Sequence, residues 1–257
     1  MLGAIAGDMI GSVYEFDNRR RKDFLLFTEA TTFTDDTILS VAVADVLLHG
    51  GDYAKAFKEY YWRYPNPTGS YGARFHQWAA APTLAPYNSW GNGSAMRVSP
   101  VGFAGTSLET VLQEAEKTAA VTHNHPEGIK GAQATAAAIF LARHRSSKAE
   151  IRDFIIEQFG YDLHRTVDEI RPTYSFNESC QGTVPEAIVA FLDATDFEDA
   201  IRNAVSLGGD SDTLTCITGG IAEAFYGDIP EHIRQSVWER LDEPMRQVVE
   251  AFRDRFL

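Results

Sequence analysis

The chain has 257 residues, of which 44% are hydrophobic and 23% charged, and its formal net charge is −13. This composition is typical of a globular protein with a sizeable core, and the negative charge argues against a general binder of nucleic acids or membrane surfaces. The two cysteines lack CxxC spacing, so we expect no disulfide. Neither a basic leader segment nor an apolar run of membrane-spanning length is visible, so we expect a cytoplasmic protein.

The first predicted helix, over residues 1–16, is rich in glycine. Each interior glycine costs a helix about 1 kcal/mol, a cost that makes sense where other backbones must approach closely. Asp8 and Glu15 are seven residues apart and therefore fall on one helical face. Two acids on an otherwise apolar face indicate a site lined by that face, and two surface acids are the alternative. The polar, basic stretch 17–32 is expected to be a loop.

An acidic cluster follows at Thr34-Asp35-Asp36-Thr37, directly before an apolar run from Ile38 to Leu48 at helical spacing. The pattern predicts a helix whose first turn contains the cluster. A second cluster, Asp210-Ser211-Asp212-Thr213, stands at the start of a later predicted helix. Two groups of carboxylate and hydroxyl oxygens at helix starts suit hard divalent cations such as Mg²⁺ or Mn²⁺. Two ordinary capped helices are the alternative.

The remaining chain is predicted to be mostly helical. Helices are expected at 52–64, 107–121, 127–145, 148–159, 184–194, 196–207, 214–226, 230–241 and 244–256. The segments 65–97 and 161–182 contain breaks and turn residues and are expected to be irregular. We find no alternating strand series and no internal repeat, so the sequence predicts a single all-α domain of about ten or more helices over residues 1–257.

Two short motifs in the middle of the chain contain polar residues. In Gly91-Asn92-Gly93 the small residues could let a ligand approach the backbone, although a simple turn is the alternative. For Arg97 we expect a structural ion pair rather than a bound anion. His123 and His125 precede a predicted helix without further ligands at zinc spacing, so we expect hydrogen-bonded histidines rather than a structural zinc site.

Taken in order, these motifs resemble those of the ADP-ribosylglycohydrolases, the family of the dinitrogenase-reductase-activating glycohydrolases. The matching stretches are Gly3-Ala4-x-x-Gly7-Asp8 with Gly11 and Glu15, Thr34-Asp35-Asp36-Thr37, Gly91-Asn92-Gly93-x-x-Met96-Arg97, Thr122-His123-x-x-Pro126 with Gly131-Ala132, and Gly208-Gly209-Asp210-x-Asp212-Thr213. The two acidic clusters are the most specific of them. The resemblance implies one compact, orthogonal multi-helix domain with two divalent metal ions at the bottom of a cleft.

The resemblance also implies roles for individual residues. The implied metal ligands are Thr34, Asp35, Asp36, Asp210, Asp212 and Thr213. The implied substrate-binding residues are Gly91, Asn92, Gly93 and Ser94 near the phosphates of ADP-ribose and His123 on the cleft wall. Glu15 matches the acid that ends the family's first helix and faces the substrate. Either Glu15 or Asp35 could take the proton from an attacking water.

The expected function is a metal-dependent hydrolase that cleaves the ribosyl C1″ glycosidic bond of ADP-ribosylated protein side chains and releases ADP-ribose. Two metal ions could hold the ribose hydroxyls and a water against an oxocarbenium-like transition state. One alternative is a hydrolase of a free derivative such as O-acetyl-ADP-ribose. Another is a non-catalytic ADP-ribose-binding protein on the same fold, which would not need six intact ligand positions. We expect a monomer without nucleic-acid or membrane partners.

Overall fold

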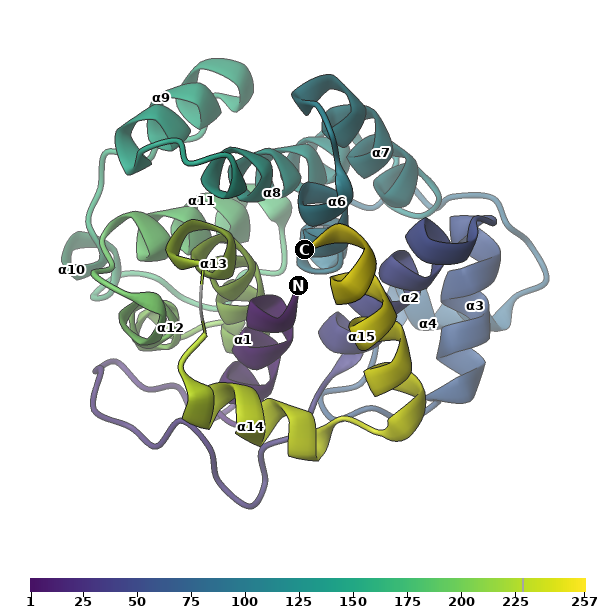
Figure 1. The fold of residues 1–257 in the computed structure, drawn as a ribbon, viewed down its shortest axis with the longest axis horizontal. Coiled ribbons are helices and arrows are strands. Elements are labelled where there is room, and N and C mark those ends of the chain that lie inside the picture. Colours follow the sequence, from purple (N-terminus) through teal and green to yellow (C-terminus); the bar gives the residue numbers. More distant parts are fainter. Residues whose placement is uncertain (228) are drawn as a thin grey trace.

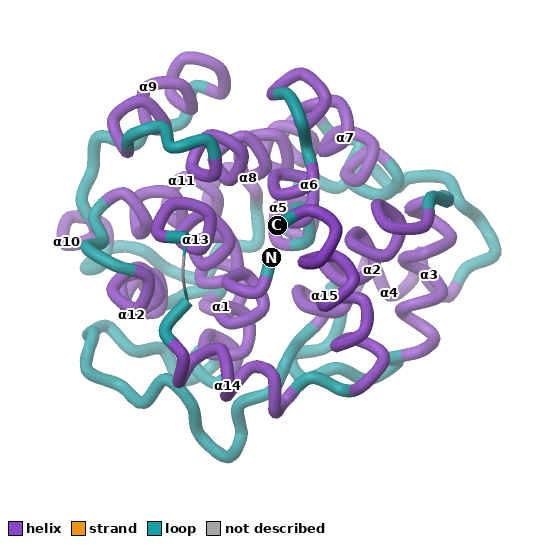
Figure 2. Tube along the Cα trace, viewed as in Figure 1, coloured by secondary structure: helices purple, strands orange, loops and turns teal. Residues whose placement is uncertain are grey.

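The computed structural model describes residues 1–227 and 229–257, which form fifteen α-helices and no strand (Figure 1, Figure 2). The helices are α1 (Leu2–Ser12), α2 (Asp35–His49), α3 (Tyr53–Arg63), α4 (Ala73–Ala80), α5 (Gly93–Met96), α6 (Ser99–Ala104), α7 (Leu108–Ala120), α8 (Pro126–Arg143), α9 (Lys148–Phe159), α10 (Val167–Ile170), α11 (Cys180–Leu192), α12 (Phe197–Leu207), α13 (Ser211–Tyr226), α14 (Glu231–Arg240) and α15 (Glu243–Phe256). The predicted all-α fold is therefore confirmed. Within these ranges no helix is long and apolar enough to cross a membrane.

The glycine-rich helix α1 lies near the middle of the molecule beside α13, and every one of its residues is buried (Figure 1). A Cβ atom on Gly7 would lie 2.0 Å from the carbonyl oxygen of Thr215, and one on Gly11 would lie 2.4 Å from that of Ser211. The two backbones are therefore in direct contact, which explains why this helix contains glycine despite its low helix propensity.

The helices that begin with the acidic clusters, α2 and α13, both pack against α1. In Figure 1, α2, α3 and α4 lie on one side of α1, and α10, α11 and α12 lie on the other. The central helix α1 contacts both α2 and α13 and therefore joins the two helices that begin with an acidic cluster.

The first helix ends at Ser12, four residues earlier than predicted, so Glu15 lies on a turn and not on a helical face. Contacts with distant segments hold this turn. The Asn18 side-chain amide donates to the carbonyls of Tyr14 and Glu15 and also to that of Gly209, and the Tyr14 hydroxyl donates to the carbonyl of Leu25. The carbonyls that a longer helix would use internally are therefore engaged elsewhere.

The segments expected to be irregular contain short helices. The helices α4 and α5 lie within 65–97, and α10 lies within 161–182. The helix α11 begins at Cys180, four residues before the predicted start, because the Ser179 side chain accepts a capping hydrogen bond from the N–H of Gly182. Gly91 and Ser179 form an isolated antiparallel bridge, which fixes the start of α11 against residues 91–94, here called the Gly91 loop.

Candidate active site

A cavity of about 360 Å³ opens between the starts of α2 and α13 and the segments that contain α4 and α5. Ten of the twelve residues predicted for the site line it: Glu15, Asp35, Asp36, Gly91, Asn92, Gly93, His123, Asp210, Asp212 and Thr213. The two exceptions are Thr34 and Ser94, both of which are buried. Most of the predicted site therefore lies around a single cavity.

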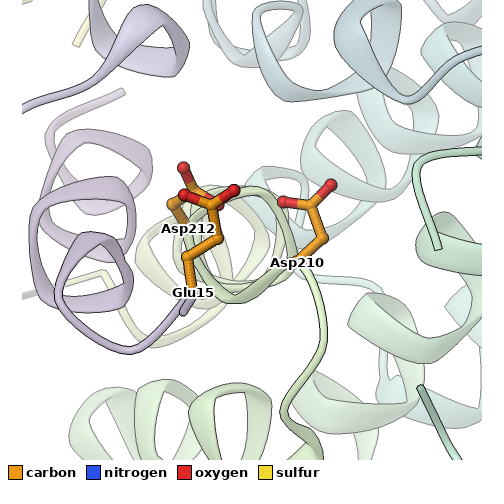
Figure 3. Close-up of side chains that lie close together, drawn as sticks. All are labelled: Glu15, Asp210 and Asp212. Atoms are coloured by element: carbon orange, nitrogen blue, oxygen red, sulfur yellow. The ribbon is translucent and has the colours of Figure 1, made fainter. Parts of the chain in front are cut away.

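Carboxylates from three separate segments form an acidic floor in this cavity, which we define as Glu15, Asp35, Asp36, Asp210 and Asp212. One oxygen each of Glu15, Asp210 and Asp212 lies within 4.8 Å of the other two (Figure 3). The hydroxyl of Thr213 donates to Asp36 at 3.5 Å, which links the second cluster to the first. The two clusters, far apart in the sequence, meet because α1 holds the starts of α2 and α13 together.

Burial and mutual repulsion raise the pKa values of these acids. The pKa of Glu15 is raised to about 7 by burial, by the charge of Asp210 and by that of Asp8. Burial first, and neighbouring carboxylates second, raise the pKa values of Asp35, Asp36 and Asp212 well above the usual range. Across residues 1–227 and 229–257, no lysine or arginine forms an ion pair with the acidic floor.

The acidic floor fits a site for divalent cations. The Oδ2 atom of Asp36 is buried and has no hydrogen-bond partner among the described residues, which is unfavourable unless another group occupies the space beside it. The floor and the adjacent Thr213 offer carboxylate and hydroxyl oxygens, the ligands that Mg²⁺ and Mn²⁺ prefer. Cations would also offset the repulsion between the acids.

Asp8 lies beneath the acidic floor and not in the cavity. Its carboxylate accepts hydrogen bonds from the backbone N–H and the hydroxyl of Thr34, at 3.0 and 2.6 Å, and from the same two groups of Thr37. Thr34 is the N-cap of α2 and also accepts from the N–H of Asp36 at 3.2 Å. Asp8 thus anchors the first turn of α2 to α1, and the role of Thr34 as a metal ligand stays a prediction.

The Gly91 loop forms the next part of the cavity wall. The side-chain amide of Asn92 donates to Asp210 at 2.7 Å, while its backbone N–H donates to the carbonyl of Glu178 at 2.7 Å. A Cβ atom on Gly93 would lie 3.1 Å from Nε2 of His123, so this glycine leaves room for the imidazole. The Ser94 hydroxyl donates to the carbonyl of Gly128, which removes it from the cavity surface.

Comparisons with known proteins agree with this arrangement. A sequence model described as ADP-ribosylglycohydrolase matches residues 1–257, the whole chain. The chain belongs to the ADP-ribosylglycohydrolase family. It is 28% identical to the ADP-ribosylhydrolase ARH3 of Bos taurus, over 92% of this chain and 87% of that protein. It is 27% identical to the ADP-ribosylarginine hydrolase Tri1 of Pseudomonas putida (strain GB-1), over 93% of this chain and 74% of that protein.

A solved structure supports the same assignment. An ADP-ribosylglycohydrolase-related protein complex matches with a TM-score of 0.74 and 26% identity, covering 100% of this chain and 96% of that one. The predicted family, the fold class and the assignment as a glycohydrolase enzyme are therefore confirmed.

The cavity wall of the glycohydrolase also contains aromatic and basic residues that the sequence analysis did not select. Trp90 and Phe176 are 42% and 54% exposed where they line the cavity. Arg74 donates to the carbonyl of Tyr87, and its guanidinium carbon lies 5.1 Å from the centre of the Tyr87 ring. The centres of the Tyr87 and His123 rings are 5.8 Å apart. The signal that could have identified these residues was the concentration of aromatic side chains beside the Gly91 loop.

The expectations for the remaining basic residues have mixed outcomes. His125 is a hydrogen-bonded N-cap of α8, as expected, since its Nδ1 accepts from the N–H of Glu127 at 3.1 Å. The expected ion pair of Arg97 is wrong, because no carboxylate in the part of the chain that the structure describes pairs with it. Its guanidinium is fully buried, lies 4.3 Å from the centre of the Phe57 ring and donates to oxygens of α7 and the turn after it.

Proposed function

We propose that this glycohydrolase cleaves the bond between ribose C1″ of ADP-ribose and an acceptor side chain of a modified protein. The observation that carries the proposal is the convergence of Glu15 and both acidic clusters on one side of a cavity. The relatives named ADP-ribosylhydrolase ARH3 and ADP-ribosylarginine hydrolase Tri1 support the same reaction class.

The charges of the cavity wall suit the two ends of such a substrate. The acidic floor supplies oxygen ligands, whereas Arg74, Tyr87 and His123 form a continuous wall beside Gly93. A diphosphate fits the wall better than the floor, because carboxylates repel phosphate and an arginine attracts it. The terminal ribose would then extend toward the floor.

The residues that would hold two divalent cations, Mg²⁺ or Mn²⁺, are Thr34, Asp35, Asp36, Asp210, Asp212 and Thr213. When bound, such ions polarise ribose hydroxyl oxygens and lower the pKa of a water. The protein contributes the geometry, since Asp8 and Asn92 hold Thr34 and Asp210 through hydrogen bonds.

Glu15 is the carboxylate that we assign to proton transfer from the attacking water. It reaches the acidic floor from a turn of its own, outside the helix starts that contain the other acids. A general base must lie within hydrogen-bond reach of the water that it deprotonates, and the position of Glu15 in the acidic floor meets that condition. Asp35 is the alternative base, and the Glu15→Gln experiment below separates the two.

Turnover assays with three substrates test the proposed function. Peptides with ADP-ribosyl-arginine or ADP-ribosyl-serine and free O-acetyl-ADP-ribose are incubated with the enzyme and Mg²⁺ or Mn²⁺, and released ADP-ribose is measured. We expect release from at least one peptide and none after chelation. Release from O-acetyl-ADP-ribose alone would favour the small-molecule alternative. Tight binding of ADP-ribose without any turnover would favour a non-catalytic binding protein.

A further inference from the structure

Arg97 lies at the cavity wall and is a buried cation without a carboxylate partner among the described residues. Its side chain is fully buried, and of its guanidinium nitrogens only Nη2 donates hydrogen bonds within the described ranges, while Nε and Nη1 have no partner there. Burial of a charge is unfavourable unless hydrogen bonds or an aromatic ring stabilise it, so the contacts of this guanidinium are informative.

One of the two hydrogen bonds of Arg97 leads to His123 through the hydroxyl of Thr122. Nη2 donates to the carbonyl of Thr118, in the last turn of α7, and to the hydroxyl of Thr122, each at 2.8 Å. The same Thr122 hydroxyl lies 2.8 Å from Nδ1 of His123. Thr122 is fully buried, so its hydroxyl has no solvent contact.

Only one arrangement of protons satisfies every hydrogen bond in the series Arg97, Thr122 and His123. An arginine can only donate, so the Thr122 oxygen accepts from Nη2. The hydroxyl proton of Thr122 then has Nδ1 as its one remaining neighbour among the described residues. Buried hydroxyls rarely leave their proton unpaired. Nδ1 is therefore the acceptor, and the ring proton of a neutral His123 is on Nε2.

The charges around His123 keep its ring neutral. Arg97 and Arg74 are the charged groups close to it, and Tyr87 is the other titratable neighbour. Burial first, and then the two arginines, lower the pKa of His123 well below its usual value. A neutral imidazole has one N–H, so its tautomer decides whether the ring donates or accepts at the cavity surface.

We propose that Arg97 and Thr122 are positioning residues that hold His123 as its Nε2–H tautomer, with this N–H directed toward the cavity beside Gly93. Nε2 makes no hydrogen bond within residues 1–227 and 229–257, and it is the His123 atom nearest to the Gly93 position. The N–H is thus available to a ligand oxygen. The step that assigns that oxygen to the ligand's diphosphate rests on the proposed function.

Nitrogen NMR on the metal-free protein tests the tautomer directly. The protein is labelled with ¹⁵N-histidine, and the ring signals of His123 are assigned with the His123→Gln variant. Long-range ¹H–¹⁵N spectra near pH 7 should show a protonated Nε2 and an unprotonated Nδ1. A protonated Nδ1, an equal mixture of tautomers or an imidazolium ring would overturn the proposal.

Two substitutions at Thr122 connect the tautomer to ligand binding. Thr122→Val removes the hydroxyl, so the Nδ1 signal should shift and the Kd for ADP-ribose with Mn²⁺ should rise about tenfold, the value of one hydrogen bond. Thr122→Ser keeps the hydroxyl and should restore both readouts. An unchanged ring spectrum and Kd in Thr122→Val would also overturn the proposal.

Thr118→Val is the matched control. Thr118 is a buried threonine in the same segment whose hydroxyl donates to the carbonyl of Ala115, and its own carbonyl still accepts from Arg97. This variant should leave the His123 spectrum and the Kd unchanged. If Thr122→Val does not fold, the wild-type spectrum alone decides the tautomer. A wild type with the expected tautomer but no affinity for ADP-ribose would support this inference and contradict the proposed function.

Discussion

Asp36 and Asp212 are buried acids of the floor whose mutual repulsion a cation would offset. Each is almost fully buried beside other carboxylates, and Asp36 has an oxygen without a partner among the described residues. Asp36→Asn or Asp212→Asn should therefore lower kcat by about 100-fold or more while the far-UV circular dichroism stays helical. Steady-state assays at saturating Mg²⁺ measure this, with the exposed Asp23→Asn as the control. Near-normal turnover in both variants would contradict the proposed cation site.

Glu15 differs from these acids because we assign it a proton-transfer role. Glu15→Gln keeps the shape of the side chain and removes its basic oxygen, so kcat should fall by about 10²-fold or more, whereas KM should change little. Michaelis–Menten analysis separates the two parameters, and Glu29→Gln, at an exposed position, is the control. An effect limited to KM would show that Glu15 only binds substrate, and Asp35 would then be the better candidate for the base.

At the level of elements, the contact between α1 and α13 positions the second acidic cluster. In Gly7→Ala the new methyl group would lie 2.0 Å from the carbonyl oxygen of Thr215, so the two helices must separate. Overpacking of this kind costs roughly 1–3 kcal/mol, which lowers the Tm of a domain of this size by several degrees. Differential scanning fluorimetry measures the shift.

The control for this contact is Gly72→Ala, because no heavy atom lies within 4 Å of the position of its new methyl group. Its Tm should stay within about one degree of the wild type, since it adds no clash. Equal Tm values for Gly7→Ala and Gly72→Ala would mean that the close approach of α1 and α13 does not limit stability.

At the level of the whole molecule, cation binding should be coupled to folding. The acidic floor is assembled only in the folded chain, so the unfolded chain should bind Mg²⁺ or Mn²⁺ poorly. A ligand that binds only the folded state at a hundredfold excess over its Kd stabilises it by about 2.7 kcal/mol. Added cation should therefore raise the Tm of the chelator-treated wild type in a fluorimetric titration.

The double variant Asp35→Asn with Asp36→Asn is the decisive comparison. Without cation it should melt at the same temperature as the wild type or higher, because fewer like charges are buried together. Its response to cation should shrink or vanish. If the double variant gained as much stability from Mn²⁺ as the wild type, Asp35 and Asp36 would not be ligands.

Much of the fold and of the site was predictable from the sequence because the signals are local. The helix α2 begins at the first acidic cluster, as predicted, with Thr34 as its N-cap. The long helices follow from apolar periodicity and capping residues within a few positions of each end. The clusters at Asp35 and Asp210 were identifiable as a pair because both contain more oxygen ligands than a cap requires. Five of the ten predicted residues that line the cavity belong to these clusters, whereas the roles of the other five were implied by the resemblance to the family.

What the tertiary structure alone decided depends on partners far away in the chain. Glu15 stands on a turn because Asn18 bonds to Gly209, and Arg97 lacks an ion pair because its neighbours are Phe57, Thr118 and Thr122. Asp8 anchors the first turn of α2 and does not line the cavity, since it accepts four hydrogen bonds from Thr34 and Thr37. Capping and periodicity act over a few residues, so they define where helices begin and which acids are exceptional. The partner of a buried polar group is chosen only when the helices pack, because each group must then find hydrogen bonds among whatever the fold brings near.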